Sequence, residues 1–152
     1  MSIAEKLKEL NIEVPVAAKP LAAYVPAVKI GNFVYTSGQL PMHNGELMFA
    51  GKVGSDFTAE QGYEAAKYCA INCLAAINTV ANIEDIEQII KVTGFVNSAA
   101  GFSGQPQVMN GASELFGQIF GEAGAHARSA VGMAELPRNA AVEVEIIVKL
   151  KN

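Results

Sequence analysis

Two apolar stretches near the end of the chain decide which fold the sequence can adopt. The second, Val142-Glu143-Val144-Glu145-Ile146-Ile147-Val148-Lys149-Leu150, alternates with a period of two, the pattern of a β-strand with one buried face. The first, Arg128-Ser129-Ala130-Val131-Gly132-Met133-Ala134-Glu135-Leu136, is mostly apolar and begins with an arginine. The turn formers Pro137-Arg138-Asn139 stand between them. The pattern therefore predicts a closing hairpin, with Glu143 and Glu145 on the face opposite the apolar side chains.

Upstream of this hairpin the sequence predicts helices placed between strands. Ser2 and Thr58 each begin a capping box, which predicts a short helix over 2–10 and the main helix over 58–81. Pro106 marks the start of a further helix that Gly121 ends. Strands are expected at 25–30, 33–36, 46–49 and 88–97, and the near-continuous apolar character of the last favours burial on both of its faces.

This order of elements predicts an α+β fold, in which one sheet carries two helices packed on one face. The other face of the sheet has few charges, so we expect another subunit to cover it and the protein to be an oligomer. Residues 1–19 form an N-terminal helix and an arm that two prolines keep extended. Residues 20–152 are expected to form a single domain.

Composition excludes several functional classes. The chain has 152 residues, enough for one domain with a substantial core. It is 51% hydrophobic and 17% charged, with a net charge of −4 and no basic cluster, so the usual electrostatic basis for binding nucleic acid is missing. No apolar run reaches the roughly 18 residues of a membrane span. The amphipathic start differs from a signal peptide, and the cytoplasm is the expected location.

Metal and redox chemistry have little support in the sequence. Cys69 and Cys73 are four residues apart in an apolar helical pattern, which favours buried free thiols over a disulfide or a metal pair. His43 and His126 are far apart in the chain, so no zinc site can be assembled. We therefore expect neither a metal nor a cofactor.

Several short motifs then occur in the order typical of a known family. They are Tyr24-Val25, Gly31-Asn32, Thr36-Ser37-Gly38-Gln39-Leu40-Pro41, Asn110, Ala127-Arg128-Ser129, Leu136-Pro137 and Val142-Glu143-Val144-Glu145. Over roughly residues 20 to 150 the chain resembles the YjgF/RidA family, also labelled endoribonuclease L-PSP. The resemblance implies a chorismate mutase-like fold and a homotrimer with three clefts between subunits. It also implies hydrolysis of enamine or imine intermediates, such as 2-aminoacrylate, to 2-keto acids and ammonium.

The resemblance also implies roles for individual residues. Arg128 stands where the family's arginine grips the substrate carboxylate, and Glu143 where its glutamate orients or activates water. Tyr24 matches the family's tyrosine and completes the expected catalytic set. The expected substrate-binding residues are Ser37, Gly38, Asn110 and Ala130, the last in the place of a frequent cysteine.

Residue chemistry leaves alternatives beside these roles. The fork of Arg128 suits a carboxylate ligand, but an arginine at this place could equally pair with an acidic neighbour. A desolvated Glu143 could act on water, whereas a solvated one would only form ion pairs, and Glu145 is its rival on the same face. Tyr24 either donates a hydrogen bond or packs. His126 is interpreted as structural or solvent-facing rather than as a base.

The predicted hairpin has a geometric consequence. Arg128 would lie six or seven residues from the position facing Glu143, about 20 Å at the usual strand rise. A site that uses both groups then requires a distorted strand or two chains, and we expect catalysis to require assembly. The alternative function is a non-catalytic trimer that binds small carboxylates in a regulatory role. It is favoured by Ala130 and by Ala22-Ala23, where the family has Gly-Pro before the tyrosine.

Overall fold

The structure is a computed structural model that describes residues 1–17, 19–20 and 22–152. Its helices are α1 (Ile3–Glu9), α2 (Ala59–Ile77) and α3 (Gln105–Phe120), with short 3-10 turns at Ile83–Asp85, Gly121–Gly124 and Pro137–Asn139. Its strands are β1 (Ala27–Ile30), β2 (Phe33–Thr36), β3 (Met42–His43), β4 (Glu46–Leu47), β5 (Ile86–Asn97), β6 (Ala127–Met133) and β7 (Val142–Leu150).

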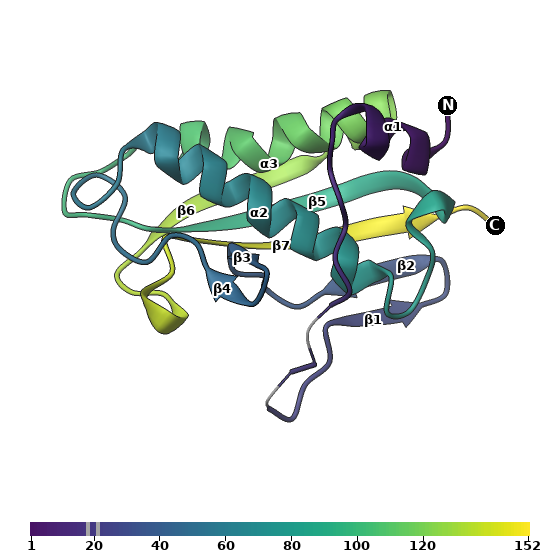
Figure 1. Ribbon diagram of the computed structural model, residues 1–152, viewed down its shortest axis with the longest axis horizontal. Coiled ribbons are helices and arrows are strands. Elements are labelled where there is room, and N and C mark those ends of the chain that lie inside the picture. Colours follow the sequence, from purple (N-terminus) through teal and green to yellow (C-terminus); the bar gives the residue numbers. More distant parts are fainter. Residues whose placement is uncertain (18, 21) are drawn as a thin grey trace.

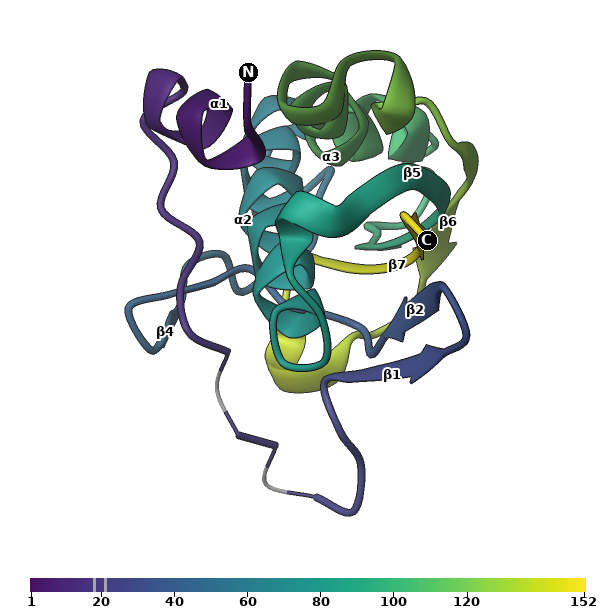
Figure 2. The same cartoon turned by 90° about the vertical axis from the view of Figure 1, so that its right-hand side faces the viewer.

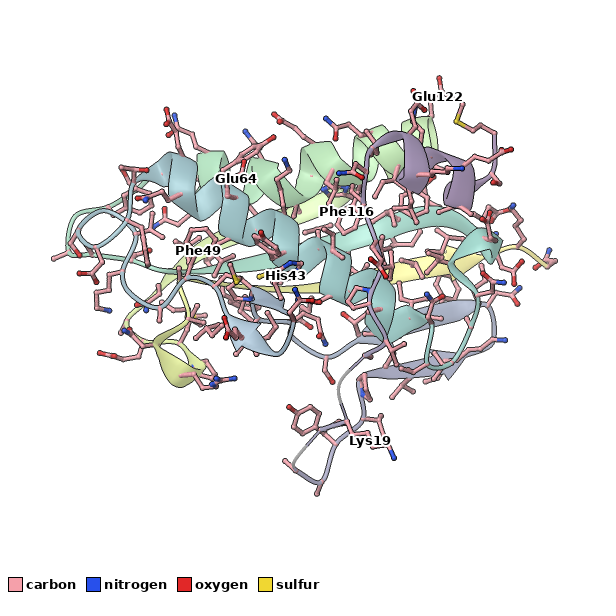
Figure 3. The ribbon with its side chains drawn as sticks, in the orientation of Figure 1. Lys19, His43, Phe49, Glu64, Phe116 and Glu122 are labelled. Carbon is pink, nitrogen blue, oxygen red and sulfur yellow. The ribbon has the colours of Figure 1, made fainter. Side chains whose placement is uncertain are left out.

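The described part of the chain forms a five-stranded sheet in the order β1-β2-β7-β5-β6, with α2 and α3 side by side on one of its faces (Figures 1 and 2). This confirms the predicted α+β class. The core lies between the helices and the sheet, where Leu74 and Phe116 meet Ile146 from β7. Phe116 points from α3 toward the sheet (Figure 3). Gly111 lets the helices approach closely, because a Cβ there would lie 2.0 Å from the carbonyl oxygen of Tyr63.

The closing hairpin is the part of the fold that the sequence predicted wrongly. β6 and β7 both form strands, but β5 lies between them, parallel to β6 and antiparallel to β7. The backbone at the end of β5 contacts both neighbours, since the N–H groups of Asn97 and Ser98 donate to Ala141 and Met133. The segment between Met133 and Val142 is long enough to cross one intervening strand, a step of about 10 Å. The long apolar β5 can therefore pair along both of its edges.

Two smaller expectations also need correction. β5 is buried only on the side facing the helices, and its other side, which includes Thr93 and Phe95, is half-buried. Its apolar run therefore does not mean burial on both faces within this chain. The strand expected at 46–49 is the short β4, which pairs with β3 outside the main sheet. That hairpin lies against α2, where the rings of His43 and Tyr68 are 5.3 Å apart (Figure 3).

The face of the sheet away from the helices, called the open face below, is rich in exposed apolar side chains. Register places Val28, Tyr35 and Ile147 in one row across β1, β2 and β7, and Ile30 beside Phe33 in the next. Exposed fractions on this face are 46% for Val28, 66% for Ile30, 39% for Phe33, 47% for Tyr35 and 41% for Val131. On other proteins, large exposed apolar patches often coincide with interaction sites.

Helix α1 packs beside α3 (Figure 2). The Glu84 carboxylate accepts hydrogen bonds from the N–H groups of Ile3 (2.9 Å) and Ala4 (2.7 Å). Those N–H groups have no partner inside the helix, and a carboxylate at a helix N-terminus is electrostatically favourable. Ser2 and Glu5 form the predicted capping box.

Candidate active site

Glu143 lies on the open face, on the central strand β7, with its side chain directly over Gly38. A Cβ atom at Gly38 would lie 2.1 Å from Oε1 of Glu143, and the next nearest atoms also belong to Glu143. Gln39 holds this approach in place, because its backbone exchanges hydrogen bonds of 2.8 and 3.0 Å with Val144. Only glycine therefore fits at position 38 with the carboxylate where it is.

The environment of Glu143 favours its protonated form. Burial, and after it the negative charge of Glu145, raises the pKa of Glu143 above its ordinary value. A carboxylate with a raised pKa is a better base toward water, because its proton affinity is higher. The contact with Gly38 distinguishes Glu143 from its rival Glu145.

Ser37 connects this carboxylate to the segment that carries Tyr24. The Ser37 hydroxyl donates to the carbonyl oxygen of Val25 at 2.6 Å, and its N–H donates to that of Pro26 at 2.8 Å. Tyr24, 59% exposed, is the residue before Val25. The Tyr24 side chain forms no hydrogen bond with Glu143 among the described residues. Ser37, Gly38 and Glu143 are called the carboxylate cluster below.

Arg128 belongs to a different surface. It pairs across β6 and β5 with the fully buried Val92, so its side chain leaves the sheet on the helix side. There Nη1 donates to Oδ1 of Asn110 (2.9 Å) and to Oγ of Ser113 (3.1 Å). Nη2 donates to the carbonyl oxygen of Pro106 at 3.4 Å. Arg128, Asn110, Ser113 and Pro106 are called the arginine cluster below.

All of these acceptors are neutral. Among the residues that the structure describes, no carboxylate lies within ion-pair distance of Arg128. Nη1 donates to two acceptors and Nη2 to one, while Nε–H has no acceptor in the same part of the chain. Nε and Nη2 lie on one edge of the guanidinium. Two parallel donors on one edge suit the two oxygens of a carboxylate. The predicted alternative, an ion pair to an acidic neighbour, is not seen within the described residues.

Ala130 lies two residues after Arg128 and on the same face of β6. It pairs with Gly94 and packs partly against the core. Gly94 has no room for a side chain, because a Cβ there would lie 2.2 Å from the sulfur of Met109. Ala130 therefore lies between the edge of the core and the arginine cluster.

Within one chain the two clusters lie on opposite faces of the sheet. Glu143 pairs with Phe95, and Phe95 pairs with Val131, three residues beyond Arg128. The Cα atoms of Arg128 and Glu143 are thus two strand spacings and three residues apart, about 14 Å. This replaces the separation expected from a hairpin. The register irregularities of β5 fall between Ile86 and Lys91, and the register from Val92 to Phe95 is regular, so no bulge brings the two groups together.

Two members of the arginine cluster were missed in the sequence. Ser113 follows Asn110 by three residues on α3, the spacing that places two side chains on one face of a helix, so this signal was available. The carbonyl of Pro106 carries no sequence signal. His126 is half-buried and hydrogen-bonded to Ser113 at 2.9 Å, in keeping with its interpretation as a structural residue.

The described residues give no sign of a metal site or of a reactive thiol. No group of three or more metal-binding side chains occurs in the described ranges. Cys69 and Cys73 are buried and free as predicted. Their thiols donate to the carbonyl oxygens of Val142 and Val144, and burial raises the pKa of both. No helix of the described chain is long and apolar enough to cross a membrane.

Comparison with known proteins shows the same architecture elsewhere. A family model described as "YjgF/chorismate mutase-like, putative endoribonuclease" matches residues 5–150. The protein TCP17 of Trypanosoma cruzi is 39% identical over 99% of this chain and 95% of its own length. A 2-iminobutanoate/2-iminopropanoate deaminase of Dermatophagoides farinae is 33% identical over 92% and 95%. A crystal structure of an Agrobacterium tumefaciens protein of unknown function has 44% identity and a TM-score of 0.91, covering 98% of this chain and 92% of its own.

Proposed function

The chain belongs to the YjgF/RidA family, and on this premise we propose that it hydrolyses enamine and imine intermediates of the 2-aminoacrylate type to 2-keto acids and ammonium. The observation that carries the proposal is the guanidinium of Arg128, which neutral acceptors hold while one edge stays open. Such a group recognises a small carboxylate, the feature shared by these substrates and their products.

The proposed reaction begins with the imine tautomer, whose carboxylate binds the open edge of Arg128. Glu143 takes a proton from a water molecule as the water oxygen attacks the imine carbon, and it returns this proton to the imine nitrogen. Glu143 then transfers the hydroxyl proton of the resulting carbinolamine to the amino nitrogen as the C–N bond breaks, which releases ammonia and gives the 2-keto acid. An imine carbon is already electrophilic, so positioning and one proton acceptor are sufficient.

The site in this proposal is shared between subunits of a homotrimer. Arg128 and Glu143 lie on opposite faces of one chain, so the Arg128 of one subunit acts with the Glu143 of another. The exposed apolar side chains of the open face supply the reason to assemble, since burying a side chain of this size contributes about 1.5–3 kcal/mol. Two free buried thiols are compatible with a reducing compartment such as the cytoplasm.

The decisive assay supplies 2-aminoacrylate generated in situ and follows release of pyruvate. Wild type should exceed the uncatalysed rate, and Arg128→Ala should return to it. The matched control is Arg138→Ala, which removes an exposed arginine whose Nη1 contacts only the sulfur of Met42 among the described residues. A wild type that releases pyruvate no faster than buffer would end the proposal for this substrate.

A second candidate function keeps the same anion site without turnover. It is a trimer that binds small carboxylates in a regulatory role, favoured by the inert Ala130 in the place of the family's frequent cysteine. Calorimetry with pyruvate separates the two functions. Binding that is lost in Arg128→Ala, with no turnover of any imine, supports this candidate, whereas absence of binding contradicts both.

A further inference from the structure

A line of hydrogen bonds runs from His126 to Arg128 through Ser113. Nδ1 of His126 lies 2.6 Å from the carbonyl oxygen of Gly124, and its Nε2 lies 2.9 Å from Oγ of Ser113. A carbonyl oxygen only accepts, so Nδ1 carries the hydrogen. In the neutral ring Nε2 is then an acceptor, and the Ser113 hydroxyl donates to it. The lone pairs of Oγ remain for Nη1 of Arg128 at 3.1 Å.

The surroundings of His126 keep the ring neutral. Burial, and to a lesser extent the positive charge of Arg128, holds the pKa of His126 below its ordinary value, against an opposing effect of the Gly124 hydrogen bond. The other groups packed on the ring are uncharged: α3 contributes Ser113 and the edge-on ring of Phe116, with centroids 6.1 Å apart. Arg128 is the charged group that acts on His126 in the described structure.

We propose that His126, in its neutral Nδ1–H form, is a positioning residue that fixes the guanidinium of Arg128 by orienting the hydroxyl of Ser113. The proposal rests on the function proposed above, in which Arg128 binds the substrate carboxylate. A serine in a helix can instead turn its hydroxyl to its own backbone. With the hydroxyl hydrogen committed to His126, Oγ presents only acceptor capacity to Arg128.

The fixed guanidinium has a consequence for binding. Nη1 is held at both of its hydrogens by side chains of α3, so the open edge with Nε–H faces one direction before any ligand arrives. A preorganised fork loses less conformational entropy when a carboxylate binds. His126 thus acts on substrate affinity without touching the substrate.

Protonation of His126 should weaken this arrangement. A hydrogen on Nε2 would compete with the Ser113 hydroxyl hydrogen, and a second positive charge would face Arg128. Because the folded-state pKa of His126 is lowered, the neutral form is present at pH 7, and the hold on Arg128 is lost as the pH falls through that lowered value. The value of kcat/KM should therefore show an acid limb that belongs to His126.

The kinetic test uses His126→Phe, Ser113→Ala and the double variant in the full-length protein. Each single variant should lower kcat/KM about tenfold, mainly through KM, and remove the His126 part of the acid limb, leaving the part that belongs to Glu143. The double variant should be no worse than Ser113→Ala, because His126 acts only through Ser113. His126→Gln, which keeps an acceptor, should recover part of the loss.

His43→Phe, the matched control at an exposed histidine beside Tyr68, should leave the pH profile of kcat/KM unchanged. Additive losses, or an acid limb in His126→Phe that is identical to that of wild type, would overturn the proposal.

A second measurement needs no substrate, so it separates failure of the positioning role from failure of the proposed function. Nitrogen-15 NMR of the ligand-free protein should show His126 as the neutral Nδ1–H tautomer. Rotation of the Arg128 guanidinium should be faster in Ser113→Ala and His126→Phe than in wild type, with both variants still folded by circular dichroism. The opposite tautomer, or unchanged rotation in both variants, contradicts the positioning role even if the enzyme is active. An inactive wild type with the expected spectra contradicts only the proposed function.

Discussion

The arginine cluster and the carboxylate cluster differ in what holds their central charge. Arg128 is fixed by the hydrogen bonds that it donates to two side chains and a carbonyl oxygen of α3, all within the same chain. Glu143 instead lies against the backbone of Gly38, on a sheet face whose apolar side chains are exposed in the described part of the chain. The first charge has a prepared geometry. The second has a raised pKa and lacks a partner surface.

The two clusters therefore suit two different tasks, anion binding for Arg128 and proton acceptance for Glu143. A cation held by neutral acceptors keeps its full charge for an anion, while a desolvated carboxylate gains proton affinity. Placed side by side in one chain, the two charges would pair and cancel both properties. Opposite faces keep them apart, and assembly can bring them to the two sides of one substrate.

Among the substitutions considered, those of Arg128 in the arginine cluster should have the largest effect on activity. Arg128→Ala should lower kcat/KM for imine hydrolysis about 1,000-fold, because it removes the charged fork that positions the substrate. Thermal unfolding should change little, since no buried carboxylate loses its partner. Arg128→Lys, which keeps the charge but not the fork, should fall in between. Equal activity of the Lys variant and wild type would show that the fork is unimportant.

The second-largest effect on activity is expected from a charged substitution on the open face, which also carries the carboxylate cluster. Tyr35→Asp should convert the proposed trimer to monomers in sedimentation velocity and lower activity about 100-fold, because it places a charge in the proposed apolar interface. Val16→Asp is the matched control, since Val16 is 97% exposed and lies in the N-terminal arm. Full activity in a monomeric Tyr35→Asp protein would contradict a site shared between subunits.

A smaller effect should follow from crowding the carboxylate itself. Gly38→Ala places a methyl group 2.1 Å from Oε1 of Glu143 and should lower kcat about tenfold by displacing the carboxylate. Gly117→Ala is the control, because a Cβ there meets nothing within 4 Å on α3. It should leave activity unchanged and raise helix stability slightly. Activity loss of the same size in both variants would mean that the contact with Glu143 is irrelevant.

The smallest expected effect is on stability. The folded-state pKa of Glu143 is raised above its ordinary value of 4.5, so ionising it costs stability as the pH rises through that range. Glu143→Gln should therefore raise Tm by up to about 2 °C at pH 7 and leave it unchanged at pH 4. Differential scanning calorimetry at the two pH values checks this, and a lower Tm at pH 7 would show that the charge stabilises the fold.

Local signals predicted most of the elements of this fold. The capping boxes at Ser2 and Thr58 both form, and the period-two pattern of 142–150 is strand β7 with one buried face. These features depend on residues only a few positions apart, so they can be predicted from the sequence. The predicted hairpin was wrong because strand pairing depends on segments that are distant in the chain. Here β5 pairs with both β6 and β7 and separates them.

The residues of the candidate site likewise fall into two groups, those that a sequence motif or spacing indicates and those that depend on a tertiary contact. Motifs at known spacing singled out Arg128 and Glu143, and the three-residue step from Asn110 could have indicated Ser113. The part proposed for His126 had no such signal, because it depends on a contact in space between Ser113, in the middle of α3, and the residue before β6.

The amino-acid sequence by itself determined the α+β class, the alternation that turns Glu143 away from the core, and the charged and polar residues available for chemistry. Only the tertiary structure decided that β5 separates β6 from β7 and that Arg128 and Glu143 leave opposite faces of the sheet. The physical reason is the geometry of a pleated sheet. The face of a residue depends on its register with a neighbouring strand, and packing of the whole core selects that register.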